Sequence, residues 1–95
     1  MPFRIDRERV SLGRSMIDTI LRRPHVQAAC GLSRSSIYAH VALGTFTRPV
    51  KIGLRSIGWP EREISALNQA RIAGVSDDGI RRLVAQLHAD RGVAL

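Results

Sequence analysis

The stretch CGLSRSSIYAHVALGTF, residues 30–46, decides how this chain folds. Ser33 has a hydroxyl that can accept a hydrogen bond from a free N–H group at the start of a helix. Ile37 and Val41 are four residues apart and therefore share one face of a helix. Gly44 follows, and glycine readily adopts the left-handed backbone conformation that ends many helices. The stretch predicts a helix that begins at Ser33 and ends before Gly44.

A shorter helix is expected directly before it, over residues 24–30. Pro24 suits the first turn, where its missing N–H group costs nothing. Gly31 ends this helix, and Leu32 is expected to pack between the two helices. Two short helices joined by a tight, glycine-containing turn form a helix-turn-helix.

A β-hairpin is expected next, in the segment RPVKIGLRSIGW, residues 48–59. β-forming residues flank a turn at residues 53–55. A short strand over residues 19–23 precedes the helices. Trp59 is expected in the core, at the junction between the hairpin and the next helix. A hairpin that follows a helix-turn-helix is a wing.

Two more helices complete the chain. Pro60 opens the first, which ends at Gly74, and Ser76 caps the second. Apolar residues of the last helix recur at spacings of three and four, which indicates one apolar face. This face either folds back on the preceding helix or meets another subunit. Its residues are Ile80, Leu83, Val84 and Leu87.

These elements predict a mostly α-helical fold with a small β-hairpin: a winged helix-turn-helix followed by a C-terminal helical hairpin. The predicted parts are a flexible N-terminal arm (1–18), a winged helix-turn-helix domain (19–74) and a C-terminal amphipathic helix (75–95).

Positive charge is concentrated in one part of the sequence. The 95 residues include 15 Lys and Arg and 8 Asp and Glu, which gives a net charge of +7. No acidic residue occurs from Thr19 to Pro60, whereas the five basic and five acidic residues from Glu61 onward cancel. A basic surface attracts polyanions, of which nucleic acid is the commonest.

The start of the 33–43 helix, the predicted recognition helix, is the expected contact with double-stranded DNA. Free N–H groups and the helix dipole favour a phosphate there. Arg34 can fork onto guanine in the major groove or onto a phosphate, while capping is the main role expected of Ser33. The predicted contacts of this helix are Ser33, Arg34, Ser35, Ser36, Tyr38 and Ala39.

The wing is expected to lie against phosphates or in a minor groove, where arginine is favoured when the groove is narrow. The predicted wing contacts are Arg48, Lys51, Arg55 and Ser56. Additional phosphate contacts are predicted at Arg22, Arg23 and His40.

Nothing in the sequence indicates an enzyme, a metal site or a cofactor. The three histidines lie on different predicted elements, and the single cysteine, Cys30, cannot form an internal disulfide. No apolar run approaches the roughly 18 residues of a membrane span, and the charged start lacks the apolar core of an export signal. We expect a cytoplasmic, nucleoid-associated protein with no membrane partner.

Residues 20–68 resemble the AlpA family of prophage regulatory proteins. The resemblance rests on GLSRSSIY at 31–38, Gly-Thr-Phe at 44–46 and Gly-Trp at 58–59. Thr47 stands where the family usually has proline, and Ser36 replaces the usual threonine. The resemblance implies a winged helix-turn-helix of the MerR/excisionase kind.

Relatives of this kind regulate transcription of mobile elements or act as excisionases, which bend DNA to direct a recombinase. We expect a transcription regulator, such as of an integrase or excision operon, with an excisionase as the alternative. A recombinase or RNA polymerase is then a possible protein partner. We also expect self-association through the C-terminal region, as a homodimer or as copies side by side on DNA.

A small basic RNA-binding or ribosome-associated protein is the alternative of another class. RNA binders that read sequence usually stack bases on exposed aromatic rings. The aromatic residues here are dispersed, and Tyr38 is the one expected to be exposed. This pattern favours DNA.

Overall fold

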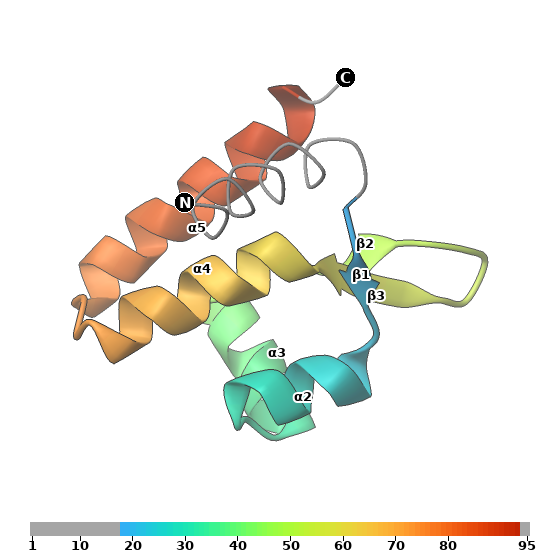
Figure 1. Cartoon of the computed structure of the whole chain (residues 1–95), viewed down its shortest axis with the longest axis horizontal. Coiled ribbons are helices and arrows are strands. Elements are labelled where there is room, and N and C mark those ends of the chain that lie inside the picture. The colour runs from blue at the N-terminus through green and yellow to red at the C-terminus, as the bar shows by residue number, and fades with distance from the viewer. Residues whose placement is uncertain (1–17, 94–95) are drawn as a thin grey trace, which may run out of the picture.

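The computed structural model describes residues 18–93. These residues form a three-stranded antiparallel sheet and four helices (Figure 1). In chain order the elements are β1 (Ile20–Leu21), α2 (Arg23–Cys30), α3 (Arg34–Leu43), β2 (Val50–Lys51), β3 (Ile57–Pro60), α4 (Glu61–Ile72) and α5 (Asp77–Val93). The predicted fold class is confirmed. The arm predicted over residues 1–18 lies outside the described residues except for Asp18.

Helices α2 and α3 form the predicted helix-turn-helix. Gly31 has a φ angle of 70°, and its N–H group donates to the carbonyl of Gln27 at 2.8 Å, which ends α2. Ser33 begins α3, because its hydroxyl accepts a hydrogen bond from the Ser36 N–H group at 3.1 Å. Val26 and Ile37 are completely buried and hold the two helices in the core. The predicted turn and cap are therefore confirmed.

The sheet joins the wing, which we define as the hairpin of residues 50–60, to the start of the described chain. Strand β3 is central and pairs with β2 on one side and β1 on the other. Gly58 permits this arrangement: a Cβ atom there would lie 2.6 Å from Cγ2 of Ile20 and 2.8 Å from the carbonyl oxygen of Leu21. Only glycine lets β1 approach β3 so closely.

Trp59 lies at the centre of the core, as expected from its position in the sequence. Its side chain is completely buried, and its indole N–H donates to the Thr47 carbonyl at 2.8 Å. The rings of Phe46 and Tyr38 lie 6.2 and 6.5 Å from it, centre to centre. The indole thereby joins the base of the wing to α3.

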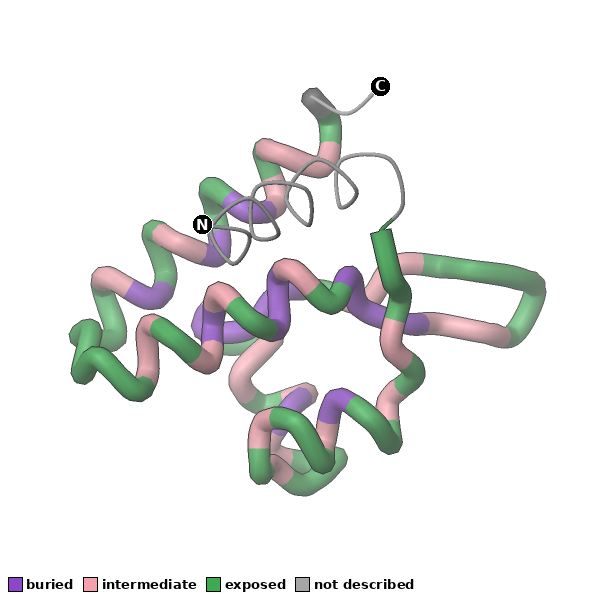
Figure 2. Tube along the Cα trace, viewed as in Figure 1, coloured by how far each residue is buried: buried purple, intermediate pink, exposed green. Residues whose placement is uncertain are grey.

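Helix α5 packs against α4 and completes the core (Figure 2). Ile80, Val84 and Leu87 are buried, and Leu83 is half-buried against the same cluster. The apolar face of α5 is therefore covered within one chain, which is the first of the two options that the sequence left open. Ser76 caps α5 by accepting the Gly79 N–H group at 3.2 Å, as predicted.

Three arginines of the last two helices hold the connection between α3 and β2. Each donates a side-chain hydrogen bond to a backbone carbonyl within residues 43–48. The pairs are Arg71 with Thr45 at 2.7 Å, Arg81 with Leu43 at 3.0 Å and Arg91 with Arg48 at 2.7 Å. Carbonyl groups in a connection have no ladder or helix partner and need donors from elsewhere. Helices α4 and α5 therefore set the path from α3 to the wing.

Candidate nucleic-acid interface

The first turn of α3 is an exposed surface that carries three of the predicted contact residues. Ser33, Arg34 and Ser35 are all exposed. The Ser33 hydroxyl accepts the Ser36 N–H group and donates to the Ser36 hydroxyl at 3.1 Å. The Arg34 guanidinium has no hydrogen-bond or ion-pair partner within residues 18–93. This arginine is therefore available to an external acceptor.

The remaining predicted residues of α3 differ in accessibility. Ala39 is exposed, whereas Ser36, Tyr38 and His40 are half-buried. The Tyr38 ring packs toward Trp59, so it is less exposed than its sequence position suggested. Nδ1 of His40 lies 2.8 Å from the Thr45 hydroxyl, which itself donates to the His40 carbonyl. This ring nitrogen is therefore engaged within the chain.

Two cationic side chains project from the wing without a partner in the described chain. Lys51 in β2 and Arg55 in the loop are exposed, and neither forms a hydrogen bond or ion pair with residues 18–93 through its side chain. Ser56 is half-buried, and its carbonyl accepts the N–H groups of Ile52 and Gly53 at 2.8 and 3.3 Å. Ser56 therefore shapes the turn from which Arg55 projects.

Arg48 lies at the base of the wing and is turned toward α5. Its backbone N–H group donates to Nε2 of His88 at 3.1 Å, and its guanidinium lies 3.2 Å from Nδ1 of the same ring. Burial, and after it the charges of Arg48 and Arg91, lower the pKa of His88, while Glu63 partly opposes the effect. The Arg48 side chain thus contacts α5, whereas those of Lys51 and Arg55 have no side-chain partner within residues 18–93.

The predicted phosphate contacts before α2 also differ from each other. Arg22 immediately precedes α2 and is exposed. Its side chain has no partner in the described part of the chain. Arg23 is half-buried and donates to the Gln27 side chain at 3.2 Å. Arg22 is therefore the freer of the two cations.

Ion pairing leaves the excess positive charge on the helix-turn-helix and the wing. Within residues 18–93, the acidic side chains in ion pairs meet arginines of α4 and α5. The pairs are Asp18 with Arg62, Asp78 with Arg81 and Glu63 with Arg91. Arg22, Arg34, Lys51 and Arg55 lie in the acid-free segment, and none of them pairs with an acidic side chain of residues 18–93. The resulting surface is suited to a polyanion.

Sequence reasoning missed three residues that hold the candidate interface in place through the connection between α3 and β2. Arg71, Arg81 and Arg91 were counted only as charges that acidic residues cancel, yet each holds the α3–β2 connection. The three-residue spacing of Asp78 and Arg81 signals a helical ion pair. No local pattern signals the bonds to residues 43–48, because their partners lie 26 to 43 residues away.

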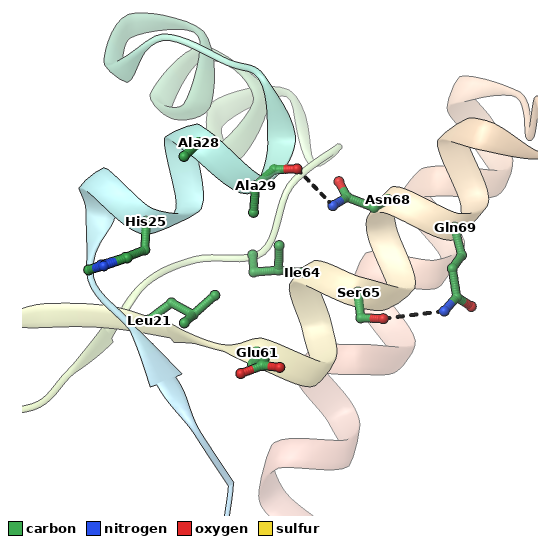
Figure 3. A pocket seen from close by; sticks show the side chains of 9 residues that line it. All are labelled: Leu21, His25, Ala28, Ala29, Glu61, Ile64, Ser65, Asn68 and Gln69. Atoms are coloured by element: carbon green, nitrogen blue, oxygen red, sulfur yellow. Dashed lines mark hydrogen bonds between the residues drawn. The ribbon is translucent and has the colours of Figure 1, made fainter. Parts of the chain in front are cut away.

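A groove of about 630 Å³ lies between α2 and α4 (Figure 3). Its apolar walls include Leu21 and Ile64, and His25 and Glu61 lie along its rim. The Asn68 side chain donates to the Ala29 carbonyl at 3.1 Å and links the two helices. No group of three or more His, Cys, Asp or Glu residues able to hold a metal occurs in the described chain.

The comparison with protein families agrees with this geometry. The family profile described as "Prophage CP4-57 regulatory protein (AlpA)" matches residues 19–72, which run from β1 through α4. The chain belongs to the AlpA family. The match contains the helix-turn-helix and the wing but excludes α5. The AlpA family is described as a regulatory one. The match confirms the resemblance found in the sequence.

One relative of the chain comes from a bacteriophage. The chain is 40% identical over 57 residues to a protein of Enterobacteria phage P4 named "Uncharacterized protein ORF88". The matched region covers 60% of this chain and 65% of the phage protein, so it spans less than two thirds of that relative. No solved structure matches the chain. Among the described residues, no helix has both the length and the apolar character of a membrane span.

Proposed function

We propose that this AlpA-family protein binds specific sequences in double-stranded DNA and regulates transcription in a prophage or integrative element. The observation that carries the proposal is the exposed first turn of α3, where Arg34 has no partner within residues 18–93. A phage regulatory role is supported by the family match. The proposal implies a cytoplasmic protein associated with the nucleoid.

In the proposed complex, α3 enters the major groove with its first turn leading. The Arg34 guanidinium forks onto O6 and N7 of a guanine, which is the commonest specific contact of arginine. Ser35 is a short donor that allows the helix to approach closely, and Ala39 leaves room for the groove wall. Sequence is therefore read mainly through α3.

The wing and the start of α2 supply contacts that position the protein without reading bases. Lys51 and Arg55 meet phosphates beside the site read by α3, and Arg22 meets a phosphate near the start of α2. Arg48 and His40 contribute indirectly, since both are engaged inside the chain. Affinity from such contacts depends strongly on salt.

Selection from a random-sequence duplex library with the full chain tests this function. We expect a defined consensus, and Arg34→Ala should weaken binding to it more than binding to a scrambled duplex. Arg82→Ala, measured on a duplex with a single site, is the matched control, because Arg82 is exposed on α5 outside the surface proposed to meet DNA. Failure to enrich any duplex, or tighter binding to structured RNA at the same salt concentration, would overturn the proposal.

Footprinting across the attachment site and the integrase promoter of the host element then separates two roles. Protection at the promoter supports the transcription regulator, whereas protection confined to the attachment site supports an excisionase that acts with a recombinase. RNA polymerase is the corresponding protein partner at a promoter.

We also propose that several copies assemble on DNA, because one small winged domain has a modest footprint, below roughly 1,000 Å². The Ile80, Leu83, Val84 and Leu87 face is largely covered by the chain itself, so assembly has to use the outer side of α5. Ala85 is exposed there. We expect Ala85→Glu to lower cooperativity on a duplex with several sites while single-site binding stays unchanged. Equal cooperativity would exclude this surface.

A further inference from the structure

The loop of the wing carries an apolar side chain that nothing in the described chain covers. Leu54 is 91% exposed, the highest value among the large exposed hydrophobic residues of residues 18–93. Figure 2 shows the loop as an exposed projection at one end of the molecule. Single exposed leucines are common on protein surfaces, so the surroundings of Leu54 decide its meaning.

The other apolar residue of the loop region has a structural role that Leu54 lacks. Cδ1 of Ile52 lies 3.1 Å from the position that a Cβ atom of Gly58 would occupy, and Cγ2 of Ile20 approaches the same position. Ile52 and Ile20 therefore cover the face of β3 at Gly58. Leu54 lies two residues after Ile52 and takes no part in covering β3.

The loop is held firmly enough to present Leu54 in a defined place. The carbonyl of Ser56 accepts the N–H groups of both Ile52 and Gly53 and closes the turn. At the base, Trp59 is buried and bonded to Thr47, and the Arg48 carbonyl is bonded to Arg91. Because these bonds hold the hairpin, the Leu54 side chain can insert between groups of a ligand without displacing the loop.

The neighbours of Leu54 are cationic. Arg55 is adjacent, Lys51 is three residues before it, and no acidic residue occurs from Thr19 to Pro60. An apolar pocket on a protein partner would require Leu54 but would not require the two cations. The minor groove of DNA matches both, because phosphates line its edges and an apolar side chain can part the stacked bases whose edges form its floor. Leucine is among the side chains that proteins insert between base steps.

We infer that Leu54 is a wedge that enters the minor groove beside the site read by α3, partly unstacks one base step and bends the duplex. The inference rests on the DNA-binding function proposed above and adds a distortion of DNA to it. Lys51 and Arg55 hold the phosphates on either side while the leucine side chain replaces part of the base stack.

The test uses the full chain and the duplex enriched by selection, with dyes at its two ends to report the bend. Wild-type protein should bend this duplex by about 20° or more, as kinks of this type do. Leu54→Ala should lose the bend, and Leu54→Met should retain it. Ile72→Ala is the matched control, because Ile72 is 86% exposed on α4, outside the wing.

A single mismatch moved through the site provides a second measurement. A mismatch lowers the cost of unstacking, so wild-type protein should bind about tenfold tighter when the mismatch lies at the wedged step. Leu54→Ala should bind matched and mismatched duplexes alike, which a loss of general affinity would not produce.

The outcomes distinguish failure of the wedge proposal from failure of the proposed DNA-binding function. If Leu54→Ala bends the duplex as wild type does and keeps the same mismatch preference, the wedge is overturned and DNA binding stands. If wild-type protein enriches no duplex, both proposals fail.

Discussion

Arg91 holds both carboxylate oxygens of Glu63, with Nε 2.7 Å from Oε2 and Nη2 2.7 Å from Oε1. The Glu63 side chain is completely buried, whereas that of Arg91 is 20% exposed. The same Nη2 donates to the carbonyl of Arg48. One guanidinium therefore joins α4, α5 and the base of the wing.

Arg91→Ala should destabilise the fold, because it leaves the buried Glu63 carboxylate without its cation. Removing one partner of a buried pair costs about 3–5 kcal/mol, and we expect about 3 kcal/mol because Arg91 reaches solvent. Urea denaturation at pH 7 measures this change. Arg62→Ala is the control: its pair with Asp18 is partly exposed to solvent and should contribute below about 1 kcal/mol. Equal effects of the two variants would contradict the role given to Arg91.

Gly58→Ala should push β1 away from β3. The added methyl group meets Cγ2 of Ile20 and the backbone oxygen of Leu21, and the backbone cannot move aside as a side chain can. Overpacking of this kind costs about 1–3 kcal/mol. Gly53→Ala provides the comparison, since the nearest atom to its added Cβ is 3.8 Å away. Thermal unfolding of both variants measures the difference, and a stable Gly58→Ala protein would disprove the close approach.

The stability of the protein should fall as the solution becomes mildly acidic, in part because of His88. Burial, followed by the charges of Arg48 and Arg91, lowers the pKa of His88 below its ordinary value of 6.5, although Glu63 acts in the opposite direction. The unfolded chain then binds a proton more readily than the folded chain. The contribution is present above about pH 6.5 and is lost as the pH falls toward the lowered pKa.

His88→Gln removes this titration and tests the assignment. The free energy of unfolding, measured from pH 7.5 to pH 5, should depend less steeply on pH in the variant than in the wild type. His25→Gln is the control, because His25 is exposed. Parallel curves for wild type and His88→Gln would show that another group is responsible.

The double variant Lys51→Ala/Arg55→Ala should weaken binding to all duplexes alike. Each lost phosphate contact lowers the slope of log affinity against log salt by about one unit, so the double variant should lose about two. Titrations of the selected and scrambled duplexes at several salt concentrations measure both quantities. An unchanged slope would show that the wing does not meet the DNA backbone.

The local features of the helix-turn-helix could be predicted because they depend on near neighbours. The Ser33 cap and the turn at Gly31 involve groups within four residues, and their sequence signals are correspondingly clear. The spacing of Ile80, Val84 and Leu87 predicted an apolar face, but periodicity alone could not say what covers it. The structure supplies that partner in α4.

The features that could not be predicted depend on contacts across the fold. The pairing of β1 with β3 joins residues about 40 positions apart, and two-residue strands leave a weak pattern. The turning of Arg48 toward His88 likewise depends on where α5 lies. A sequence pattern identifies Arg48 as a cation of the wing segment but cannot distinguish an engaged cation from a free one.

The donors that hold residues 43–48 have a consequence for how members of the family diverge. Arg81 and Arg91 lie after residue 72, where the match to the family ends. The setting of the wing relative to α3 is thus partly determined by a segment outside the shared region. Exchange of that segment between family members would alter the setting of the wing relative to α3. On the DNA-binding function proposed above, the choice of target would then change without any substitution in the first turn of α3 or in the wing.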